Sequence, residues 1–164
     1  GEINKNKNVA FSAHCISSLN VNKNKYMFTV IGKISDKKIY DHIKKFTFIK
    51  YLSPQKKEFL IKYYRDADIF VMPSHTETFG LVYVEAMSQG TPVIYTKNQG
   101  FDNQFEDGIV GYAINPNSEN DFSKAIYSIL NNYLKISENC INLSENFSWN
   151  HIERKYKEIY YSIL

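Results

Sequence analysis

The sequence predicts an α/β fold in three layers, with a parallel sheet between two layers of helices and further helices at the C-terminus. Short apolar segments rich in β-branched and aromatic residues alternate with longer segments of helical periodicity, which is the pattern of successive β-α-β units. The chain of 164 residues has the length of one domain. Its hydrophobic content of 43% supplies enough apolar side chains for a core.

The strands are expected where β-branched, aromatic and other apolar residues run together and stop at glycine, proline or a polar residue. In chain order, these runs are 26–32, 46–52, 68–72, 92–95 and 111–114. Since helical segments separate them, we expect the strands to pair in parallel.

The helices are expected where apolar residues recur at about one helical turn. In chain order, these segments are 9–19, 35–45, 53–65, 81–89, 118–131, 133–146 and 149 to the end. Ser53 would cap the third helix, with Pro54 in its first turn, and Gly90 would end the fourth. Residues 1–8 and 20–25 would form polar loops.

Composition excludes several classes of protein. The net charge of +3, from 20 basic and 17 acidic residues, is too balanced to indicate nucleic-acid binding. Cys15 and Cys140 stand alone, without the spacing of a disulfide scaffold or a zinc finger, which fits a reducing compartment. No apolar run has the length of a membrane span, and no signal peptide is evident. A cytoplasmic protein is the expectation.

The loop from Pro73 to Leu81 carries most of the candidate functional residues. It would leave the carboxyl end of a parallel strand, where ligands bind in open α/β sheets. Thr78, Phe79, Gly80 and Leu81 would begin the next helix, and the free N–H groups of that turn favour an anion such as phosphate. Gly80 would allow close approach of the backbone.

Two acidic residues extend this interpretation. Glu85, one turn inside the helix, could accept hydrogen bonds from the vicinal diol of a ribose, and Glu77 would meet whatever lies beyond the phosphates. Phosphate, ribose and a third group in a row describe a nucleotide-sugar. On spacing alone, the alternative is equally open: Glu77 caps the helix and Glu85 is an exposed side chain.

The segment from Glu77 to Glu85 has the form E-x7-E, and it lies between Ala67–Ser74 and Gly90–Ile94. This block closely resembles the group 1 glycosyltransferases (glycosyltransferase family 4), retaining enzymes of the GT-B fold. The likeness continues through Asp107-Gly108, Gly111 and Phe147–Trp149, so it covers essentially the whole chain.

The resemblance implies that residues 1–164 form the Rossmann-like, donor-binding C-terminal half of such an enzyme. The N-terminal acceptor-binding domain would be absent, and the first strand of this half would lie before Gly1.

The resemblance also implies roles for single residues. Glu77, the candidate catalytic residue, would hydrogen-bond the hydroxyls of the donor sugar and would not act as nucleophile, and Glu85 would hold the ribose. The backbone at Thr78, Phe79, Gly80 and Leu81 would contact the sugar and the diphosphate. The family's G-R-L-x-x-x-K element matches Gly1–Lys7, so Lys7 would bind the diphosphate, a role that suits a flexible point charge. The alternative for Lys7 is an ordinary lysine of a polar loop.

Base recognition is expected at Phe48–Tyr51, which matches the family's F-x-G-x segment and brings in Lys50 and Tyr51. Three positions depart from the family pattern. Glu2 replaces an arginine, Lys50 replaces a glycine, and Asn103 replaces the acidic residue of G-x-P-E. These changes put phosphate affinity, the base pocket and the role of the loop at Gly100–Asn103 in question.

The expected function is binding of a UDP- or GDP-sugar for transfer of a hexose to a glycan or lipid-linked acceptor, without an essential metal. The setting implied by the resemblance is bacterial surface-polysaccharide synthesis, in the cytoplasm or at the inner membrane surface. The isolated chain would transfer no sugar. The alternatives are a sugar-nucleotide epimerase of the same fold and a non-catalytic interaction module with a degenerate site.

Other candidates are weaker. Asp66-Ala-Asp68 has the form of a metal-binding D-x-D, but it would lie across a helix end and a strand start. His75 could touch phosphate or sugar, whereas the remaining histidines lack the spacing of metal ligands: His14, His42 and His151. The aromatic tail that begins at Trp149 would pack on the sheet or on the absent half. Several lysines would form a solvated face, with anionic lipid as the less favoured partner: Lys37, Lys38, Lys44, Lys45, Lys56 and Lys57.

Overall fold

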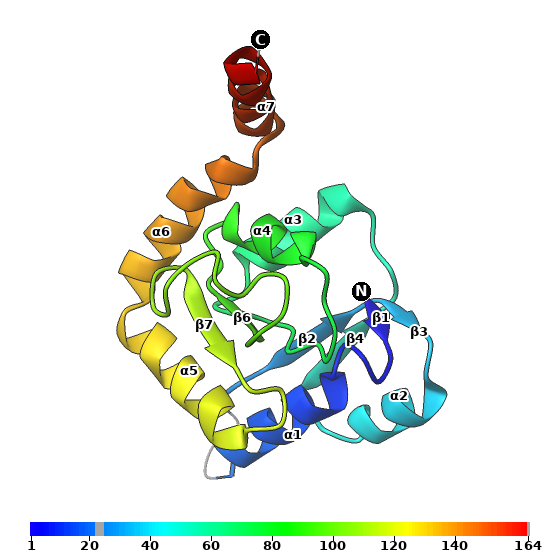
Figure 1. Cartoon of the computed structure of the whole chain (residues 1–164). Coiled ribbons are helices and arrows are strands. Elements are labelled where there is room, and N and C mark those ends of the chain that lie inside the picture. The colour runs from blue at the N-terminus through cyan, green and yellow to red at the C-terminus, as the bar shows by residue number, and fades with distance from the viewer. Residues whose placement is uncertain (22–24, 164) are drawn as a thin grey trace.

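The computed structural model describes residues 1–21 and 25–163, and it has the three-layer α/β architecture that the sequence predicts. In Figure 1 the strands lie between helices α1, α2 and α5 below and helices α3 and α4 above. Helix α1 packs against α2 and α5, and α4 packs against α3 and α6. Helices α1, α2, α4, α5 and α6 each bury apolar residues against the sheet or a neighbouring helix, whereas none of the described residues of α3 and α7 is fully buried.

All strand pairs in the described part of the chain are parallel, as expected. The strands, in chain order, are β1 (Glu2–Ile3), β2 (Phe28–Ile31), β3 (Lys33–Ile34), β4 (Ile49–Leu52), β5 (Phe70–Val71), β6 (Val93–Thr96) and β7 (Gly111–Ile114). They form three separate ladders: β1 with β3, β2 with β4, and β5 with β6 and β7. Since β5, β6 and β7 run the same way, the loops that follow them leave from one edge of the sheet.

The helices, in chain order, are α1 (Val9–Leu19), α2 (Lys37–Ile43), α3 (Lys57–Arg65), α4 (Leu81–Met87), α5 (Glu119–Asn131), α6 (Tyr133–Ser144) and α7 (Trp149–Ile163), with a 3-10 turn η1 (Glu145–Phe147) before α7. All seven were predicted from the spacing of apolar residues. The Ser118 hydroxyl accepts a hydrogen bond from the Asp121 N–H and caps α5.

The predicted start of α3 is wrong. Ser53 and Pro54 lie in a loop, and the helix begins at Lys57 after Lys56, which makes no side-chain cap. Ser-Pro is a good start signal only where the next residues can already turn. Here the chain first has to leave the end of β4 at Leu52, so the first helical turn comes three residues later than the signal suggests.

Two short strands were missed. Residues 1–8 were expected to be a loop, but Glu2 and Ile3 pair with Lys33 and Ile34 as β1 and β3. Two-residue strands carry too little periodicity to be recognised in a sequence. The predicted turn over 20–25 falls partly outside the described residues, because 22–24 are not described, and neither is the last residue, 164.

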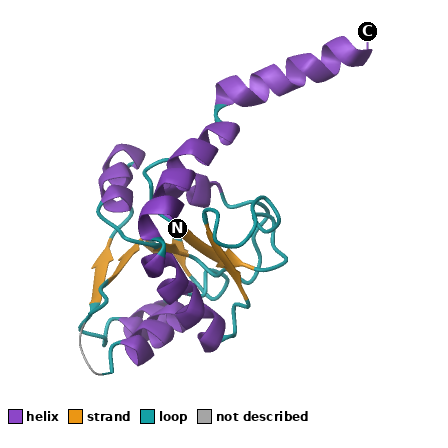
Figure 2. Ribbon diagram, turned by 90° about the vertical axis from the view of Figure 1, so that its left-hand side faces the viewer, coloured by secondary structure: helices purple, strands orange, loops and turns teal. Residues whose placement is uncertain are grey.

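Helix α7 projects away from the rest of the molecule, as both views show (Figures 1 and 2). None of its described residues is buried, and 84% of the surface of Trp149 is exposed. The expectation that the aromatic tail packs on the sheet is therefore wrong. The second alternative for the aromatic tail, packing on the absent half of the enzyme, stays a prediction.

Three further features bear on the sequence-based exclusions. Cys15 and Cys140 are free and buried, and burial raises the pKa of both thiols to about 12. Across residues 1–21 and 25–163, no helix combines the length and the apolar character needed to cross a bilayer. The same part of the chain holds no cluster of three or more His, Cys, Asp or Glu side chains arranged for a metal ion.

The centre of the core is a group of aromatic rings between α4 and β6. Tyr83 and Tyr95 are each only 1% exposed, and the Phe101 ring lies 4.9 Å from both of their rings. The Tyr83 hydroxyl donates a hydrogen bond of 2.7 Å to the Met72 carbonyl, whereas the Tyr95 hydroxyl is buried with no hydrogen-bond partner. Burial raises the pKa of both hydroxyls, so both stay protonated.

These two tyrosines give a matched pair of variants. We expect Tyr83→Phe to lower the free energy of unfolding by about 0.5–1.5 kcal/mol, because it removes one of the two donors to the buried Met72 carbonyl, the other being the Ser74 N–H at 2.8 Å. Tyr95→Phe should be neutral or stabilising, because it removes a buried hydroxyl that has no partner. Urea unfolding of both variants measures the difference. Equal losses in the two variants would contradict this assignment of partners.

Candidate functional site

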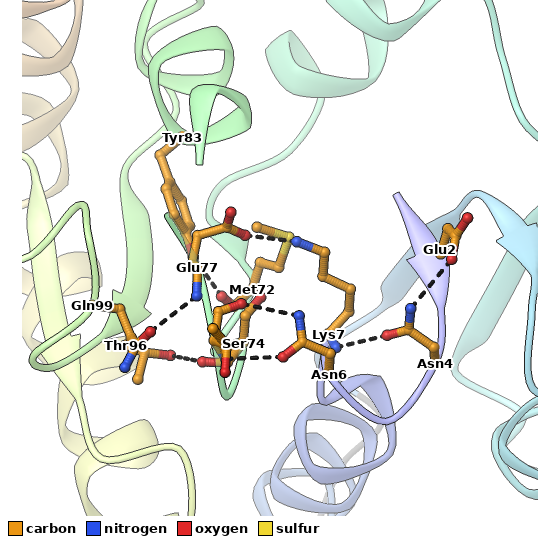
Figure 3. Close-up of polar contacts among 11 residues, drawn as sticks. Glu2, Asn4, Asn6, Lys7, Met72, Ser74, Glu77, Tyr83, Thr96 and Gln99 are labelled. Carbon is orange, nitrogen blue, oxygen red and sulfur yellow. Dashed lines mark hydrogen bonds and ion pairs between the residues drawn. The ribbon is translucent and has the colours of Figure 1, made fainter. Parts of the chain in front are cut away.

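The candidate site lies at the edge where β5 and β6 end and the loop from Met72 to Gly80 begins. Met72 donates its backbone N–H to the Ile94 carbonyl and receives the Tyr83 hydroxyl on its own carbonyl. The Thr96 hydroxyl donates a buried hydrogen bond of 2.6 Å to the Ser74 carbonyl (Figure 3). Strand β6 and helix α4 thus fix the first three residues of the loop.

Glu77 is held through its backbone. Its N–H donates a hydrogen bond of 2.9 Å to the Gln99 side-chain oxygen, and its carbonyl accepts one of 3.0 Å from the Gly100 N–H. A Cβ at Gly100 would lie 1.6 Å from the Thr78 carbonyl oxygen, so only glycine allows the two loops to approach this closely.

The side chain of Glu77 meets Lys7. The Lys7 ammonium lies 2.6 Å from Glu77 Oε2, and the two side chains are only 23% and 13% exposed (Figure 3). Lys7 is itself fixed at its backbone, where its N–H donates to the Asn4 side-chain oxygen. Helix α4 begins after Gly80 with no side-chain cap. The alternative in which Glu77 caps that helix is therefore wrong, and Lys7 is not an ordinary lysine of a solvated loop.

The loops that carry these two residues are joined by Asn6, which directly precedes Lys7. Its side-chain amide donates to the Thr76 carbonyl and accepts from the Thr76 N–H, both at 2.9 Å. Its backbone carbonyl accepts the His75 N–H at 2.8 Å. Lys5, Asn6 and His75 also line a shallow open hollow of about 420 Å³.

Helix α4 starts at Leu81, as predicted, directly after Gly80. Gly80 has a left-handed backbone with φ of 83°, and a Cβ there would lie 2.4 Å from the buried Tyr83 ring. Phe79 packs against Phe101 and Phe147. Thr78 and Leu81 are exposed, Phe79 is partly buried, and Gly80 between them is buried.

Glu85 lies in the second turn of α4, facing α3. Its carboxylate receives a long hydrogen bond of 3.4 Å from the Tyr64 hydroxyl and pairs with the Lys57 ammonium at 3.2 Å. Burial raises the pKa of Tyr64, with the Glu85 charge adding to the shift, so this hydroxyl remains a donor. Glu85 is 32% exposed and is thus neither a fully solvated side chain nor a core residue.

Lys50 and Tyr51 are not brought together by the structure. As neighbours on β4 they lie on opposite faces of the strand. Lys50 lines a hollow of about 330 Å³ along α3 with Phe59, Lys62 and other residues, whereas the Tyr51 hydroxyl donates to the Gly32 carbonyl at 3.0 Å. Among the hydrogen bonds and ion pairs of the described residues, none links either side chain to Lys7, Glu77 or Glu85.

The remaining candidates are peripheral. Asp66 ends α3 and Asp68 precedes β5, as expected, and both are exposed. His14 lies 3.8 Å from Glu119 and His42 packs on Phe46. Asn103 is exposed with a left-handed backbone, and the neighbouring Asp102 carboxylate accepts the backbone N–H groups of Asn98 and Asn103.

Sequence reasoning missed two contributors, Asn6 and Gln99. Both are polar residues in loops that follow strands of the sheet, which is the only local signal they carry. Their partners lie 70 and 22 positions away along the chain, so only the folded arrangement reveals them.

Three comparisons with known proteins bear on this arrangement. Residues 1–147 match the family model described as glycosyl transferases group 1. D-inositol 3-phosphate glycosyltransferase of Corynebacterium kroppenstedtii is 33% identical over 115 residues, which are 68% of this chain and 26% of that relative. The chain therefore spans about a quarter of the length of that curated relative.

Solved structures agree on the fold. Sucrose-phosphate synthase from Thermosynechococcus elongatus superposes with a TM-score of 0.81 at 21% identity, over 99% of this chain and 44% of its own. HepE of Anabaena, in complex with UDP and glucose, superposes with a TM-score of 0.76 at 20% identity, over 99% of this chain and 46% of its own.

The turn into α4 yields a stability prediction. We expect Gly80→Ala to lower the free energy of unfolding by more than 2 kcal/mol, since a left-handed non-glycine residue costs about 1–2 kcal/mol and the new methyl group would overlap the fixed Tyr83 ring. Gly108→Ala is the control. Its φ of 87° is similar, but its Cβ would lie 3.1 Å from the Tyr112 hydroxyl oxygen, so it carries mainly the backbone cost. Thermal unfolding should show the larger loss for Gly80→Ala, and equal losses would contradict the overlap.

Proposed function

This chain belongs to the group 1 glycosyl transferases, and on that premise we propose that it binds the nucleotide-sugar donor of a retaining glycosyltransferase. The observation that carries the proposal is the partly buried pair of Lys7 and Glu77. It lies beside the Gly80 turn at the carboxyl edge of a parallel sheet, which is where α/β folds bind nucleotides.

Lys7 is the proposed ligand of the diphosphate. An ammonium on a flexible stem can leave Glu77 and follow a phosphate oxygen, and a charge-assisted bond in a partly buried place is stronger than a neutral one. The backbone N–H groups of Phe79, Gly80 and Leu81 would add donors from the turn into α4.

Glu85 is the proposed ligand of the ribose. Its carboxylate has acceptor sites left after the contacts with Tyr64 and Lys57. Lys57 is 78% exposed, so it can move away when a diol arrives. The Tyr64 hydroxyl would then orient the carboxylate.

Glu77 is the proposed ligand of the sugar. Its carboxylate can accept hydrogen bonds from sugar hydroxyls once Lys7 turns to phosphate, and we assign it no role as nucleophile. UDP is the first donor to test, since HepE was crystallised with UDP and glucose, and GDP is the second. Lys50 and Tyr51 cannot both contact the nucleobase of the donor, since their side chains lie on opposite faces of β4.

In the whole enzyme we propose transfer of a hexose to a glycan or lipid-linked acceptor held by a separate N-terminal domain. Surface-polysaccharide synthesis in the cytoplasm, with peripheral association at the inner membrane, is the proposed setting. The chain alone should transfer no sugar, since holding the acceptor in place accounts for several kcal/mol of the barrier.

Two other functions share this fold. An epimerase would release and convert its sugar without an acceptor, so product analysis of the full-length enzyme separates it from a transferase. A non-catalytic module with a degenerate site would bind no nucleotide. The departures at Glu2, Lys50 and Asn103 are the features that favour the second of these.

The binding test uses calorimetric titration of the chain with UDP, GDP and ADP and their sugars. We expect one base to bind, and Lys7→Met to weaken that binding about 10- to 100-fold, the equivalent of about 1.4–2.8 kcal/mol for a lost charge-assisted bond. Glu85→Ala should weaken nucleotide binding by a similar factor.

Lys124→Met, on the exposed side of α5, is the matched control and should leave the affinity unchanged. We also expect binding without added manganese and no change with a chelator. Unchanged affinity in Lys7→Met and Glu85→Ala would contradict the proposed site, and no binding of any nucleotide would favour the degenerate module.

A further inference from the structure

Asn6 makes an unusual set of contacts for a side chain in a short polar loop. It lies between β1 and α1 and forms three hydrogen bonds with two consecutive residues of the loop after β5, His75 and Thr76. Both functional atoms of its amide are used, one as donor and one as acceptor. Figure 3 shows Asn6 between Lys7 and the loop that carries Glu77.

The place of these contacts in the chain gives them a consequence for the site. Asn6 directly precedes Lys7, and Thr76 directly precedes Glu77. Asn6 and Thr76 are therefore each one position away from a charged residue of the pair. The two bonds of the Asn6 side-chain amide, together with the backbone bond from the His75 N–H to the Asn6 carbonyl, restrain the separation of the Lys7 and Glu77 backbones.

Other contacts in the region do not provide this link. Gln99 and Gly100 fix Glu77 to the loop after β6, and Thr96 fixes Ser74 to β6 itself. Asn4 fixes Lys7 within its own segment. Besides the ion pair of Lys7 and Glu77, the hydrogen bonds that join the segment of Lys7 to the loop of Glu77 are, among the described residues, those of Asn6.

We propose that Asn6 is a positioning residue that places the Lys7 ammonium and the Glu77 carboxylate at the distance the donor requires. Asn6 makes no contact with the proposed nucleotide-sugar itself and acts through the side chains of Lys7 and Glu77. The effect on ligand binding rests on the proposed function, whereas the effect on the Lys7–Glu77 pair does not.

The first experiment measures affinity for the nucleotide that the wild-type chain binds. We expect Asn6→Ala to weaken it about 5- to 20-fold. Asn139→Ala is the matched control, because Asn139 also donates from its side-chain amide to a backbone carbonyl, that of Ile109 at 3.0 Å, but on helix α6. It should lower the melting temperature without changing the affinity more than twofold.

A double-mutant cycle separates positioning from general loss of stability. If Asn6 acts through Lys7, the double variant should bind no more weakly than Lys7→Met alone, so Lys7→Met should cost about 5- to 20-fold less in affinity in the Asn6→Ala background than in the wild type. Additive losses, or an Asn6→Ala affinity equal to that of the wild type, would overturn the proposal.

The second experiment needs no ligand. Melting temperatures of Lys7→Met, Glu77→Gln and the double variant give the coupling of the ion pair, first in the wild-type background and then with Asn6→Ala. We expect non-additive shifts in the first and additive shifts in the second. Coupling that survives the loss of Asn6 would overturn the inference.

This second cycle also tests the positioning role of Asn6 separately from the proposed binding of a nucleotide-sugar. If the wild-type chain binds no nucleotide, the proposed function fails, and the coupling of Lys7 and Glu77 still decides the role of Asn6. Should Asn6→Ala not fold, Asn6→Asp takes its place, since it keeps the size and the acceptor oxygen but loses the donor to the Thr76 carbonyl.

Discussion

The hydrogen bond from the Tyr83 hydroxyl to the Met72 carbonyl is the contact on which the rest of the site depends. It joins helix α4 to the end of β5. The two ends of the loop between them are therefore held at a fixed separation. The buried Tyr83 ring then lies under Gly80, where it excludes a Cβ and leaves only the left-handed glycine turn. The start of α4 follows from these two restraints.

Long-range polar contacts add to this arrangement from both sides. Asn6 approaches the loop from the segment before α1, and Gln99 approaches it from the loop after β6. Each satisfies a backbone group that would otherwise need water. The loop is therefore held by hydrogen bonds to several of its backbone groups although it belongs to neither a helix nor a strand, which suits a site that has to present charges at fixed places.

The helices and the parallel strands could be predicted from the sequence because periodicity and apolar runs are local properties. Strand Gly111–Ile114 was located to the residue and α5 within one. The two missed strands, β1 and β3, and the misplaced start of α3 also have local causes. The two-residue strands lack a period, and the Ser53-Pro54 signal was overridden by the path of the chain out of β4.

The candidate site was predictable only in part. Glu77, Gly80 and Glu85 stand out because a motif and a turn carry them. The resemblance assigned Lys7 to the diphosphate and Glu77 to the sugar, but the contact between these two side chains was not predicted. Asn6 and Gln99 were missed because an asparagine or glutamine in a polar loop has no sequence signature until its distant backbone partner is known.

The charges of the site differ in what burial does to them. Lys57 is well exposed, so its pairing with Glu85 is worth little and is easily exchanged. Lys7 and Glu77 are largely shielded from water, so separating them would leave two partly desolvated charges without partners.

Under the proposed function, a bare diphosphate that draws Lys7 away would leave the Glu77 carboxylate uncompensated. A donor that carries a sugar supplies phosphate oxygens to the ammonium and hydroxyl donors to the carboxylate at once. The ion pair would thus link recognition of the diphosphate to recognition of the sugar, so that the complete donor is favoured over the nucleotide that remains after transfer.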